Sequence, residues 1–574
     1  TVTGVQTCAL PISFMLRASV IRRFMSSFPK GRKIVIVGGV AGGGSAAARL
    51  RRLDETASIT VFEKGPYNAF ANCGLPYYVG GVIPQEKSLL VSSQKQFREY
   101  FNVDVKTNHE VVKINRKEKT VLVKDLASNK TFEVAYDKLI LSPGSRPFIP
   151  PINGVNAPGV FQLRDIPDSR QIKAWIETRN AKKAVIVGGG FIGLEMAENL
   201  KIKGLDVTVI EQAPHVMPNL SDELATVLES KMKEKGIHVL SGCSLKEIIS
   251  KDDSSLELKC GDGSILPCDL VLMSVGVVPN SELARNAGLE LGVKNCIKVD
   301  DHMTTSDKDI LAVGDVVQVK DYITGFDVNV PLAGPANRQG RIAADVLCGL
   351  PSYFRGVQGT SVCGMFDLCV AMTGHTPASL LRSNAMNPDD IGIVSVHSPN
   401  HANYYPGSSM IHLNLTFNKR TGQVLGGQAV GTAGVDKRID VISSYIHMNG
   451  TVTDLVQAEL CYSPPYGAAK DIVNLAGMVA ENICRGLLHP VTWVQSFNED
   501  TFKLDTRDTG VFNKDPLPGF TNVPLGTIRD NLNKLPKDKI IDVSCRIGRT
   551  AYYACRILEQ NGYNVRHLPG GWNT

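Results

Sequence analysis

The chain has 574 residues, of which 43% are hydrophobic and 21% charged, and its formal net charge is +6. This length predicts about four domains, and the composition is that of ordinary globular proteins. The charge is too small at this length to indicate nucleic acid as a partner, and no apolar run is long enough to span a bilayer. The 13 cysteines show neither metal-ligand spacing nor a disulfide framework. This pattern favours a reducing, cytoplasmic location and predicts no metal centre.

Residues 1–30 are expected to lie outside the folded protein. Residues 2–12 resemble a translated sequencing adapter, so an artefact is the first interpretation, and no function is expected for Cys8. A leader is the alternative, because the segment is basic at Arg17, Arg22 and Arg23 without acidic neighbours.

A dinucleotide-binding unit begins at Lys33. An apolar strand over 33–37 precedes a glycine-rich turn, a helix over 45–53 and a second strand over 58–62 that ends at an acid. Glycines let the backbone approach a pyrophosphate, the helix N-terminus offers N–H groups, and the acid binds ribose hydroxyls. Valine replaces the middle glycine of the GxGxxG pattern. The predicted cofactor contacts are Gly38, Gly39, Val40, Ala41, Gly42, Gly43 and Glu63.

A single cysteine, Cys73, follows this unit in the stretch Asn-Ala-Phe-Ala-Asn-Cys-Gly-Leu-Pro-Tyr-Tyr over 68–78. Pro76 suits the first turn of a helix, and a thiol at a helix N-terminus is favoured as thiolate. No second cysteine lies within five residues. Redox chemistry would therefore need an external partner: a small thiol, a sulfane sulfur atom, or oxygen as sulfenate. A buried structural cysteine is the alternative.

Two arginines, Arg49 and Arg52, share one face of the helix in this unit. They form either a solvated basic face or a site for the phosphates of an anionic thiol near Cys73.

A second dinucleotide unit begins at Ala184. A strand over 184–187 leads into the full fingerprint Gly188, Gly190 and Gly193, a helix to Leu200, and a strand over 207–210 that ends at Glu211. A carboxylate at that position favours NADH over NADPH, because it binds the ribose 2′-hydroxyl and repels a 2′-phosphate. Two units predict two dinucleotides, FAD and NADH.

Two later apolar strands are expected to complete these domains. The strand over 269–276 ends at Gly276 and closes the second one. The strand over 310–316 returns to the first, where Gly314 and Asp315 would bring a carboxylate to a ribityl hydroxyl. A helix over 336–348 would then point its N-terminus at the isoalloxazine.

With these motifs the chain resembles the flavin disulfide reductase family, and its one-cysteine signature resembles the coenzyme A-disulfide reductase branch. The resemblance implies an α/β protein with two Rossmann-like domains and an α+β dimerisation domain. Its expected parts are the FAD-binding domain over 31–150 and 272–350, the NAD-binding domain over 151–271 and the dimerisation domain over 351–487.

The same resemblance implies a homodimer with coenzyme A as a candidate bound ligand. Two tyrosines of the partner subunit, carried over as Tyr404 and Tyr462, would lie over the redox cysteine. Tyr405 is a rival for Tyr404, and packing beside proline turns is the alternative for both sites. Further contacts to coenzyme A would come from Asn72, Asn337 and Lys470.

The segment over 490–574 resembles a rhodanese domain of α/β type. A strand over 539–544 precedes the loop from Cys545 to Thr550 and a helix to Gln560. Such a loop can cradle an anionic persulfide on Cys545, and Arg546 and Arg549 add positive charge. Relatives fused to this reductase often have arginine in place of Thr550, which leaves the sulfur donor open. A rhodanese fold with a spare cysteine is the alternative. The sequence ends two residues after Trp572, and truncation there is one interpretation.

The resulting hypothesis is an FAD-dependent enzyme that reduces coenzyme A disulfide, coenzyme A persulfide or polysulfide with NADH through Cys73. The tyrosines would protonate the leaving group, and the rhodanese domain would pass sulfane sulfur to or from Cys73 at high effective concentration. Two alternatives stay open: an NADH oxidase or peroxidase that uses a Cys73 sulfenate, and a sulfur carrier or redox sensor with an inactive reductase half. Neither nucleic acid nor a membrane is expected as a partner.

Overall fold

The structure is a computed structural model that describes residues 30–251 and 255–571. The expectations for residues 1–29 and for Trp572 therefore lie outside the described residues. The chain forms two compact units. The first comprises the residues up to Lys182 together with 248–256 and 269–357, and the second comprises the remainder. No helix in the described ranges is long and apolar enough to cross a membrane.

A five-stranded parallel sheet forms the centre of the first unit. Its strands read as almost continuous apolar runs because the sheet is buried, which is typical of parallel sheets. Ile34, Ile36 and Leu139 are fully buried in it. In spatial order the strands are β19 (Ile310–Ala312), β7 (Lys138–Leu141), β1 (Lys33–Val37), β2 (Ser58–Phe62) and β3 (Asp104–Lys106).

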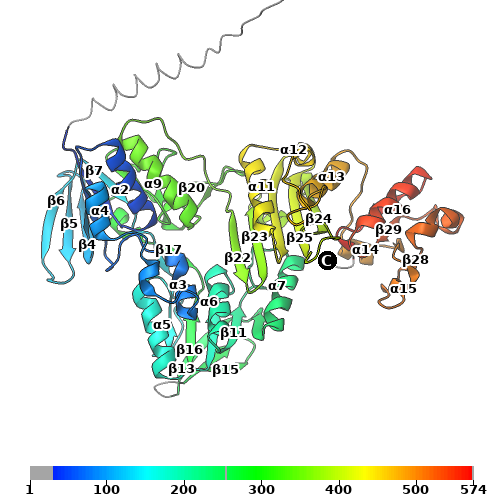
Figure 1. Cartoon of the computed structure of the whole chain (residues 1–574), viewed down its shortest axis with the longest axis horizontal. Helices are drawn as coiled ribbons and strands as arrows, with labels where there is room; N and C mark the ends of the chain where they lie inside the picture. Colours follow the sequence, from blue (N-terminus) through cyan, green and yellow to red (C-terminus); the bar gives the residue numbers. More distant parts are fainter. Residues whose placement is uncertain (1–29, 252–254, 572–574) are drawn as a thin grey trace, which may run out of the picture. The chain divides into compact units, whose positions relative to one another are not determined.

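Two helices, α2 (Ala41–Leu53) and α9 (Ala333–Leu347), pack against each other beside this sheet (Figure 1). Both begin earlier than predicted, α2 by four residues and α9 by three. Gly42, in the first turn of α2, packs closely against the middle of α9. A Cβ atom on Gly340 of α9 would lie 2.3 Å from the carbonyl oxygen of Gly42 in α2.

The remaining parts of the first unit are shorter. An antiparallel sheet comprises β4 (His109–Asn115), β5 (Thr120–Asp125) and β6 (Thr131–Ala135), within the stretch predicted to be rich in strands. The strand predicted over 269–276 is β16 (Leu270–Met273), which pairs in parallel with β9 (Val160–Phe161). The other elements are η1 (Asn72–Gly74), α3 (Leu75–Gly80), η2 (Glu86–Leu89), α4 (Gln94–Phe101), β8 (Ser145–Pro147), α5 (Ile166–Thr178), β17 (Val277–Pro279), α8 (Glu282–Asn286), η3 (Val293–Asn295), β18 (Ile297–Lys298), β20 (Val317–Lys320) and β21 (Asp327–Val328).

The second unit contains the other strand–glycine–helix motif. Parallel strands β10 (Lys183–Val187), β11 (Asp206–Glu211) and β12 (Ile237–Ser241) pair in that order. Helix α6 (Phe191–Ile202) connects the first two, close to the predicted helix, and α7 (Asp222–Glu234) precedes the third. Strands β13 (Leu245–Ser250), β14 (Leu256–Cys260) and β15 (Ile265–Cys268) follow.

An antiparallel sheet forms the next part of this unit. Its order is β22 (Ser361–Met365), β23 (Leu368–Gly374), β26 (Val424–Gly431), β25 (Met410–Asn418) and β24 (Ile391–Pro399). Helices α11 (Val435–His447) and α13 (Ile472–Cys484) pack on it (Figure 1). Shorter helices are α10 (Pro377–Arg382), η4 (Pro388–Asp390) and α12 (Val452–Gln457).

The last module contains a parallel sheet of four strands with the predicted strand–loop–helix at its centre. The order is β28 (Thr521–Asn522), β27 (Phe502–Asp505), β29 (Ile541–Ser544) and β30 (Val565–His567). Helix α16 (Arg549–Gln560) follows the loop and buries one face, including Ala551 and Leu558. The module also contains α14 (Trp493–Asn498), α15 (Thr509–Phe512) and η5 (Leu525–Lys534).

Candidate active site

The first glycine turn, between β1 and α2, is shaped to hold a dinucleotide. Gly38 has a φ of +93°, and a Cβ atom on it would lie 2.1 Å from the carbonyl oxygen of Ser142. A Cβ atom on Gly43 would lie 1.9 Å from the carbonyl oxygen of Gly38. These two positions require glycine, because the chain turns sharply at Gly38 and the first turn of α2 packs against that turn, as in dinucleotide-binding motifs.

Glu63 lies at the end of β2, where the sequence predicts the ribose-binding acid. Its two carboxylate oxygens accept hydrogen bonds from the N–H groups of Gly39 and Gly65, both at 2.8 Å. Burial raises the pKa of Glu63, against the effect of these two hydrogen bonds. Val40, in place of the middle glycine, is the N-cap residue of α2, and Ala41 and Gly42 form the first turn, where helix N–H groups can bind phosphate.

The second glycine turn repeats this geometry around Gly188. That residue has a φ of +106°, and a Cβ atom on Gly193 would lie 2.0 Å from its carbonyl oxygen. Gly190 differs, because a Cβ atom there would have no protein atom within 4 Å and would point into open space. Glu211 ends β11 and accepts hydrogen bonds from the N–H groups of Gly189 at 2.7 Å and Ala213 at 2.8 Å.

The later glycines lie at sharp turns of the first unit. Gly276 has a φ of +112°, and its carbonyl oxygen accepts a hydrogen bond from the N–H of Phe148 at 2.8 Å. Gly314 has a φ of +86° and donates its N–H to Gln339 of α9 at 2.7 Å. The buried Gln339 was not predicted from the sequence. A glutamine on the core face of a helix was the available signal.

Asp315 follows this turn, and two residues from other segments of the chain hold its carboxylate in position. The hydroxyl of Ser145 donates to it at 2.9 Å, and Arg164 pairs with it at 4.0 Å. These partners hold the carboxylate at the C-terminal edge of the sheet, where parallel sheets bind their ligands.

Cys73 is exposed in η1, directly before α3. Pro76 lies in the first turn of α3, as predicted. The segment is tied to the first glycine turn, because the N–H of Ala69 donates to the carbonyl oxygen of Gly39 at 3.0 Å. Gly74 is packed, since a Cβ atom there would lie 2.7 Å from the side chain of Leu89. The cysteine is therefore not the buried structural residue that was the alternative.

The predicted phosphate and coenzyme A contacts of the first unit have different surroundings. Arg49 forms an ion pair with Asp345 of α9 at 2.7 Å, whereas Arg52 is exposed. Asn337 accepts a hydrogen bond from the hydroxyl of Ser45 and donates to the carbonyl oxygen of Ala333 at 2.8 Å. Asn72, beside the cysteine, is half-buried.

In the second unit, the two predicted tyrosines lie together. The hydroxyl oxygens of Tyr404 and Tyr462 are 3.1 Å apart, and both side chains are exposed. Their hydrogen bond raises the pKa of Tyr404. The rival Tyr405 instead contacts the ring of His401 edge to face at 5.7 Å.

A buried ion pair, absent from the sequence-based predictions, links the segments that carry these tyrosines. Arg438 of α11 pairs with Asp471 at 2.7 Å and donates to the carbonyl oxygen of Asn400 at 2.7 Å. Asp471 caps α13, and the exposed Lys470 precedes it. A further backbone hydrogen bond joins Ala402 to Gly467 at 2.9 Å. An arginine on an otherwise apolar helix face was the only sequence signal.

Cys545 lies at the end of β29, in the predicted loop before α16, and it is buried. Gly548 has a φ of +80°, and its carbonyl oxygen lies 2.9 Å from the Nε2 atom of the buried His567. The hydroxyl of Thr550 lies 3.2 Å from that of Thr506. The loop is thus fixed on both sides, while Arg546 and Arg549 are exposed.

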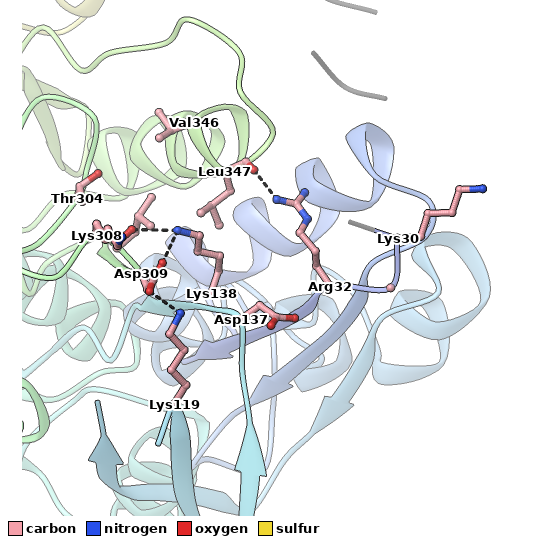
Figure 2. Close-up of a pocket in the computed structure, with 12 residues that line it drawn as sticks. Lys30, Arg32, Lys119, Asp137, Lys138, Thr304, Lys308, Asp309, Val346 and Leu347 are labelled. Atoms are coloured by element: carbon pink, nitrogen blue, oxygen red, sulfur yellow. Dashed lines mark hydrogen bonds and ion pairs between the residues drawn. The ribbon is translucent and has the colours of Figure 1, made fainter. Parts of the chain in front are cut away.

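A surface pocket of about 440 Å³ in the first unit contains none of the predicted site residues. It lies where β1, β7 and β19 begin, at the opposite ends of these strands from the glycine turn. Figure 2 shows Asp309 in it between Lys119 and Lys138, each 2.6 Å away. These two ammonium groups lower the pKa of Asp309 to about 2. The lining carries five basic and two acidic side chains, so the ion pairs at Asp309 balance only part of the positive charge of this pocket.

Comparison with known proteins gives the same organisation. Residues 32–340 match the family described as pyridine nucleotide-disulphide oxidoreductase, residues 360–471 its dimerisation domain, and residues 491–574 the rhodanese-like domain. The coenzyme A disulfide reductase of Staphylococcus haemolyticus strain JCSC1435 is 36% identical over 458 residues, which is 79% of this chain and 100% of that protein.

Two solved structures are similar over almost the whole chain. The reduced CoADR-RHD of Bacillus anthracis has a TM-score of 0.92 and 42% identity, and the similarity covers 95% of this chain and 97% of that one. The NAD-dependent persulfide reductase of A. fulgidus has a TM-score of 0.88 and 36% identity, with 94% of this chain and 99% of that one covered. These matches agree with the two glycine turns, their paired acids and the exposed cysteine tied to the first turn. They show that the chain belongs to the pyridine nucleotide-disulphide oxidoreductase family and carries a rhodanese-like domain.

Proposed function

We propose that the chain reduces coenzyme A persulfide, and with it coenzyme A disulfide or polysulfide, using NADH. As in its family, FAD and NAD(H) are the cofactors. The first glycine turn with Glu63, Gly314 and Asp315 fits FAD, and the second turn with Glu211 fits NADH, because each combines a tight glycine turn with an acid at the end of the next strand. The observation that carries the proposal is the exposed Cys73 joined through Ala69 to the first glycine turn.

Bound FAD supplies two-electron reduction of a sulfur atom on Cys73. The thiolate of Cys73 attacks the outer sulfur of a coenzyme A persulfide. A new S–S bond forms on Cys73, the S–S bond of the coenzyme A persulfide breaks, and the departing coenzyme A thiolate takes up a proton. Reduction of the Cys73 persulfide then releases sulfide and restores the thiolate. The overall balance is NADH + H⁺ + CoA–S–SH → NAD⁺ + CoA–SH + H₂S.

The tyrosine pair is the proposed proton donor for the leaving thiolate. One hydroxyl accepts a hydrogen bond from the other, so the accepting hydroxyl can donate its own proton to a ligand. Arg52, Asn72, Asn337 and Lys470 are proposed contacts for the phosphates and amide groups of coenzyme A. Arg49 is a weaker candidate for a phosphate contact than Arg52, because its guanidinium already forms an ion pair with Asp345. The dimerisation domain supports a homodimer as the active form.

The rhodanese-like domain is proposed to handle sulfane sulfur on Cys545. The loop after β29 is held by hydrogen bonds and carries two exposed arginines, which suits an anionic persulfide.

We propose the domain limits 31–150 with 272–350, 151–271, 351–487 and 490–574, and a reducing cytoplasmic location. The twelve cysteines that the structure describes are all thiols, which agrees with such a compartment.

Anaerobic NADH oxidation with coenzyme A persulfide, coenzyme A disulfide and polysulfide tests this function. Cys73→Ser should lose at least 10³-fold in turnover with all three substrates, whereas Cys484→Ser, at another exposed cysteine, should retain it. Cys545→Ser should keep the disulfide reaction and lose sulfur transfer from thiosulfate to cyanide. Full turnover by Cys73→Ser would disprove the proposal.

A second candidate, reduction of oxygen through a Cys73 sulfenate, is consistent with the same exposed thiol. Oxygen uptake with NADH that exceeds the anaerobic persulfide rate would favour it. If NADH failed to bleach the bound flavin, the carrier or sensor hypothesis would replace both.

A further inference from the structure

Three possible metal ligands come together in the second unit beside the NAD-binding motif. Cys243 lies between β12 and β13, Cys260 ends β14, and Asp262 lies in the turn after it. One ligand atom from each, the two sulfur atoms and a carboxylate oxygen, lies within 4.8 Å of the other two. Two thiolates and a carboxylate form a donor set that suits zinc and similar thiophilic cations.

The spacing is close to that of a tetrahedral site. With metal–sulfur bonds of about 2.3 Å, two ligating sulfur atoms lie about 3.8 Å apart. The two sulfur atoms would therefore approach each other by up to about 1 Å from the observed limit of 4.8 Å, and the carboxylate oxygen, with a metal–oxygen bond of about 2.0 Å, would approach them by up to about 1.3 Å. Both cysteines are buried and Asp262 is exposed, so a cation can enter from the carboxylate side and keep a water as its fourth ligand.

The backbone holds the three residues in place without a cation. The N–H of Gly261 donates to the carbonyl oxygen of Ser244 at 2.7 Å, which fixes the two cysteine-bearing segments side by side. Asp262 accepts, on one oxygen, hydrogen bonds from the N–H and hydroxyl of Ser264 at 2.9 and 2.7 Å. Such outer contacts orient a ligating carboxylate and leave its second oxygen for the cation.

The cluster is also connected to the proposed NADH site. The N–H of Cys243 donates to the carbonyl oxygen of Glu211 at 2.9 Å. The side chain of Glu211 in turn holds the N–H groups of Gly189 and Ala213. A cation on Cys243 would therefore brace the strand end from which the ribose-binding acid projects.

We propose that Cys243, Cys260 and Asp262 bind one thiophilic divalent cation of the zinc class, with water as the fourth ligand. Binding exchanges two thiol protons for the cation, M²⁺ + 2 RSH → M(SR)₂ + 2 H⁺, and involves no electron transfer. The site is independent of the reductase chemistry at Cys73. Its role is to stabilise the NAD-binding motif.

Cobalt(II) titration of the full-length holoenzyme tests the site, because thiolate–cobalt charge transfer is visible in the near ultraviolet. The titration uses a Cys73→Ser, Cys545→Ser background so that the reactive thiols do not compete. One equivalent of Co²⁺ should bind with this absorption and with tetrahedral visible bands, and Zn²⁺ should displace it. Cys243→Ser and Cys260→Ser should each abolish the signal, and Asp262→Asn should weaken binding at least tenfold.

Two controls make the result decisive. Cys369→Ser, at a half-buried cysteine of the same unit, should leave the titration unchanged. Asp262 is exposed, so Asp262→Asn tests the site even if a buried cysteine variant fails to fold. An unchanged spectrum and stoichiometry in the Cys243 and Cys260 variants would overturn the proposal. A disulfide between these two residues in anaerobically purified enzyme, found by mass spectrometry, would overturn it as well.

Discussion

The hydroxyl groups of Tyr404 and Tyr462 lie 3.1 Å apart although the residues are 58 positions apart in the sequence. Each tyrosine is on an exposed loop, and the hydrogen bond gives both rings a defined position. Tyr404 thus forms this contact, whereas its neighbour Tyr405 packs against His401.

Replacing either paired tyrosine should slow sulfur transfer without affecting the flavin. Loss of a general acid costs about 10² to 10⁴ in rate, so Tyr404→Phe and Tyr462→Phe should lower kcat with coenzyme A persulfide by about 100-fold. Bleaching of the flavin by NADH in a stopped-flow experiment should stay unchanged. Tyr405→Phe is the matched control and should retain nearly full turnover; a greater loss in that variant would assign the role to Tyr405.

Removing the buried arginine should destabilise the second unit strongly. Arg438 and Asp471 are 2% and 4% exposed, and breaking a buried pair leaves an uncompensated charge that costs about 3–5 kcal/mol. Arg438→Met should therefore lower the Tm clearly in a thermal unfolding scan. Arg420→Met removes the exposed pair between Arg420 and Asp390 at 3.0 Å and should change stability by less than about 1 kcal/mol. Equal shifts in both variants would contradict this account.

Two glycines of the NAD-binding turn should respond differently to alanine. Gly193→Ala places a Cβ atom 2.0 Å from the carbonyl oxygen of Gly188, so the motif must distort and the protein should lose stability. Gly190→Ala meets no protein atom within 4 Å and should fold normally, but its methyl group would occupy space that a pyrophosphate needs. The expected result is a lower Tm for Gly193→Ala, and a normal Tm with at least a tenfold higher KM for NADH for Gly190→Ala. A normal KM in the folded Gly190 variant would argue against NADH at this turn.

A buried histidine, His397, beside the half-buried His412 should make the protein sensitive to mild acid. The Nδ1 atoms of His397 and His412 are 2.8 Å apart, and burial lowers the pKa of His397 to about 4. The folded-state pKa lies below the unfolded value of about 6.5, so the neutral ring stabilises the fold above pH 6.5. This stability is lost as the pH falls from about 6.5 towards 4, and its full amount is about 3 kcal/mol.

Chemical denaturation at pH 7.5 and pH 5.0 measures this effect. His397→Gln should reduce the loss of stability between the two pH values, because the titrating ring is gone. His238→Gln, at an exposed histidine, should show the same loss as the parent protein. If His397→Gln loses as much stability as the parent, the acid sensitivity arises elsewhere.

Local sequence patterns were sufficient for the parts of the fold where each signal is contained in a few residues. The two strand–glycine–helix–strand–acid motifs and the strand–loop–helix around Cys545 all occur where predicted. Helix α2 begins at Ala41, four residues earlier than predicted. Three glycines in a row disfavour a helix in isolation, but here they allow close packing against the backbone of Gly38 and Gly340.

The sequence alone indicated the family, both dinucleotide-binding motifs, the single cysteine at position 73 and the two tyrosine segments, because each depends on short-range spacing and backbone requirements. Only the tertiary structure showed which tyrosines are in contact and that Arg438 links the segments that carry them. It also showed that Cys243, Cys260 and Asp262 lie close together. These contacts join residues that are far apart along the chain, and strand pairing and helix packing bring them together. No local pattern encodes such a distance, since it results from how the separate elements pack.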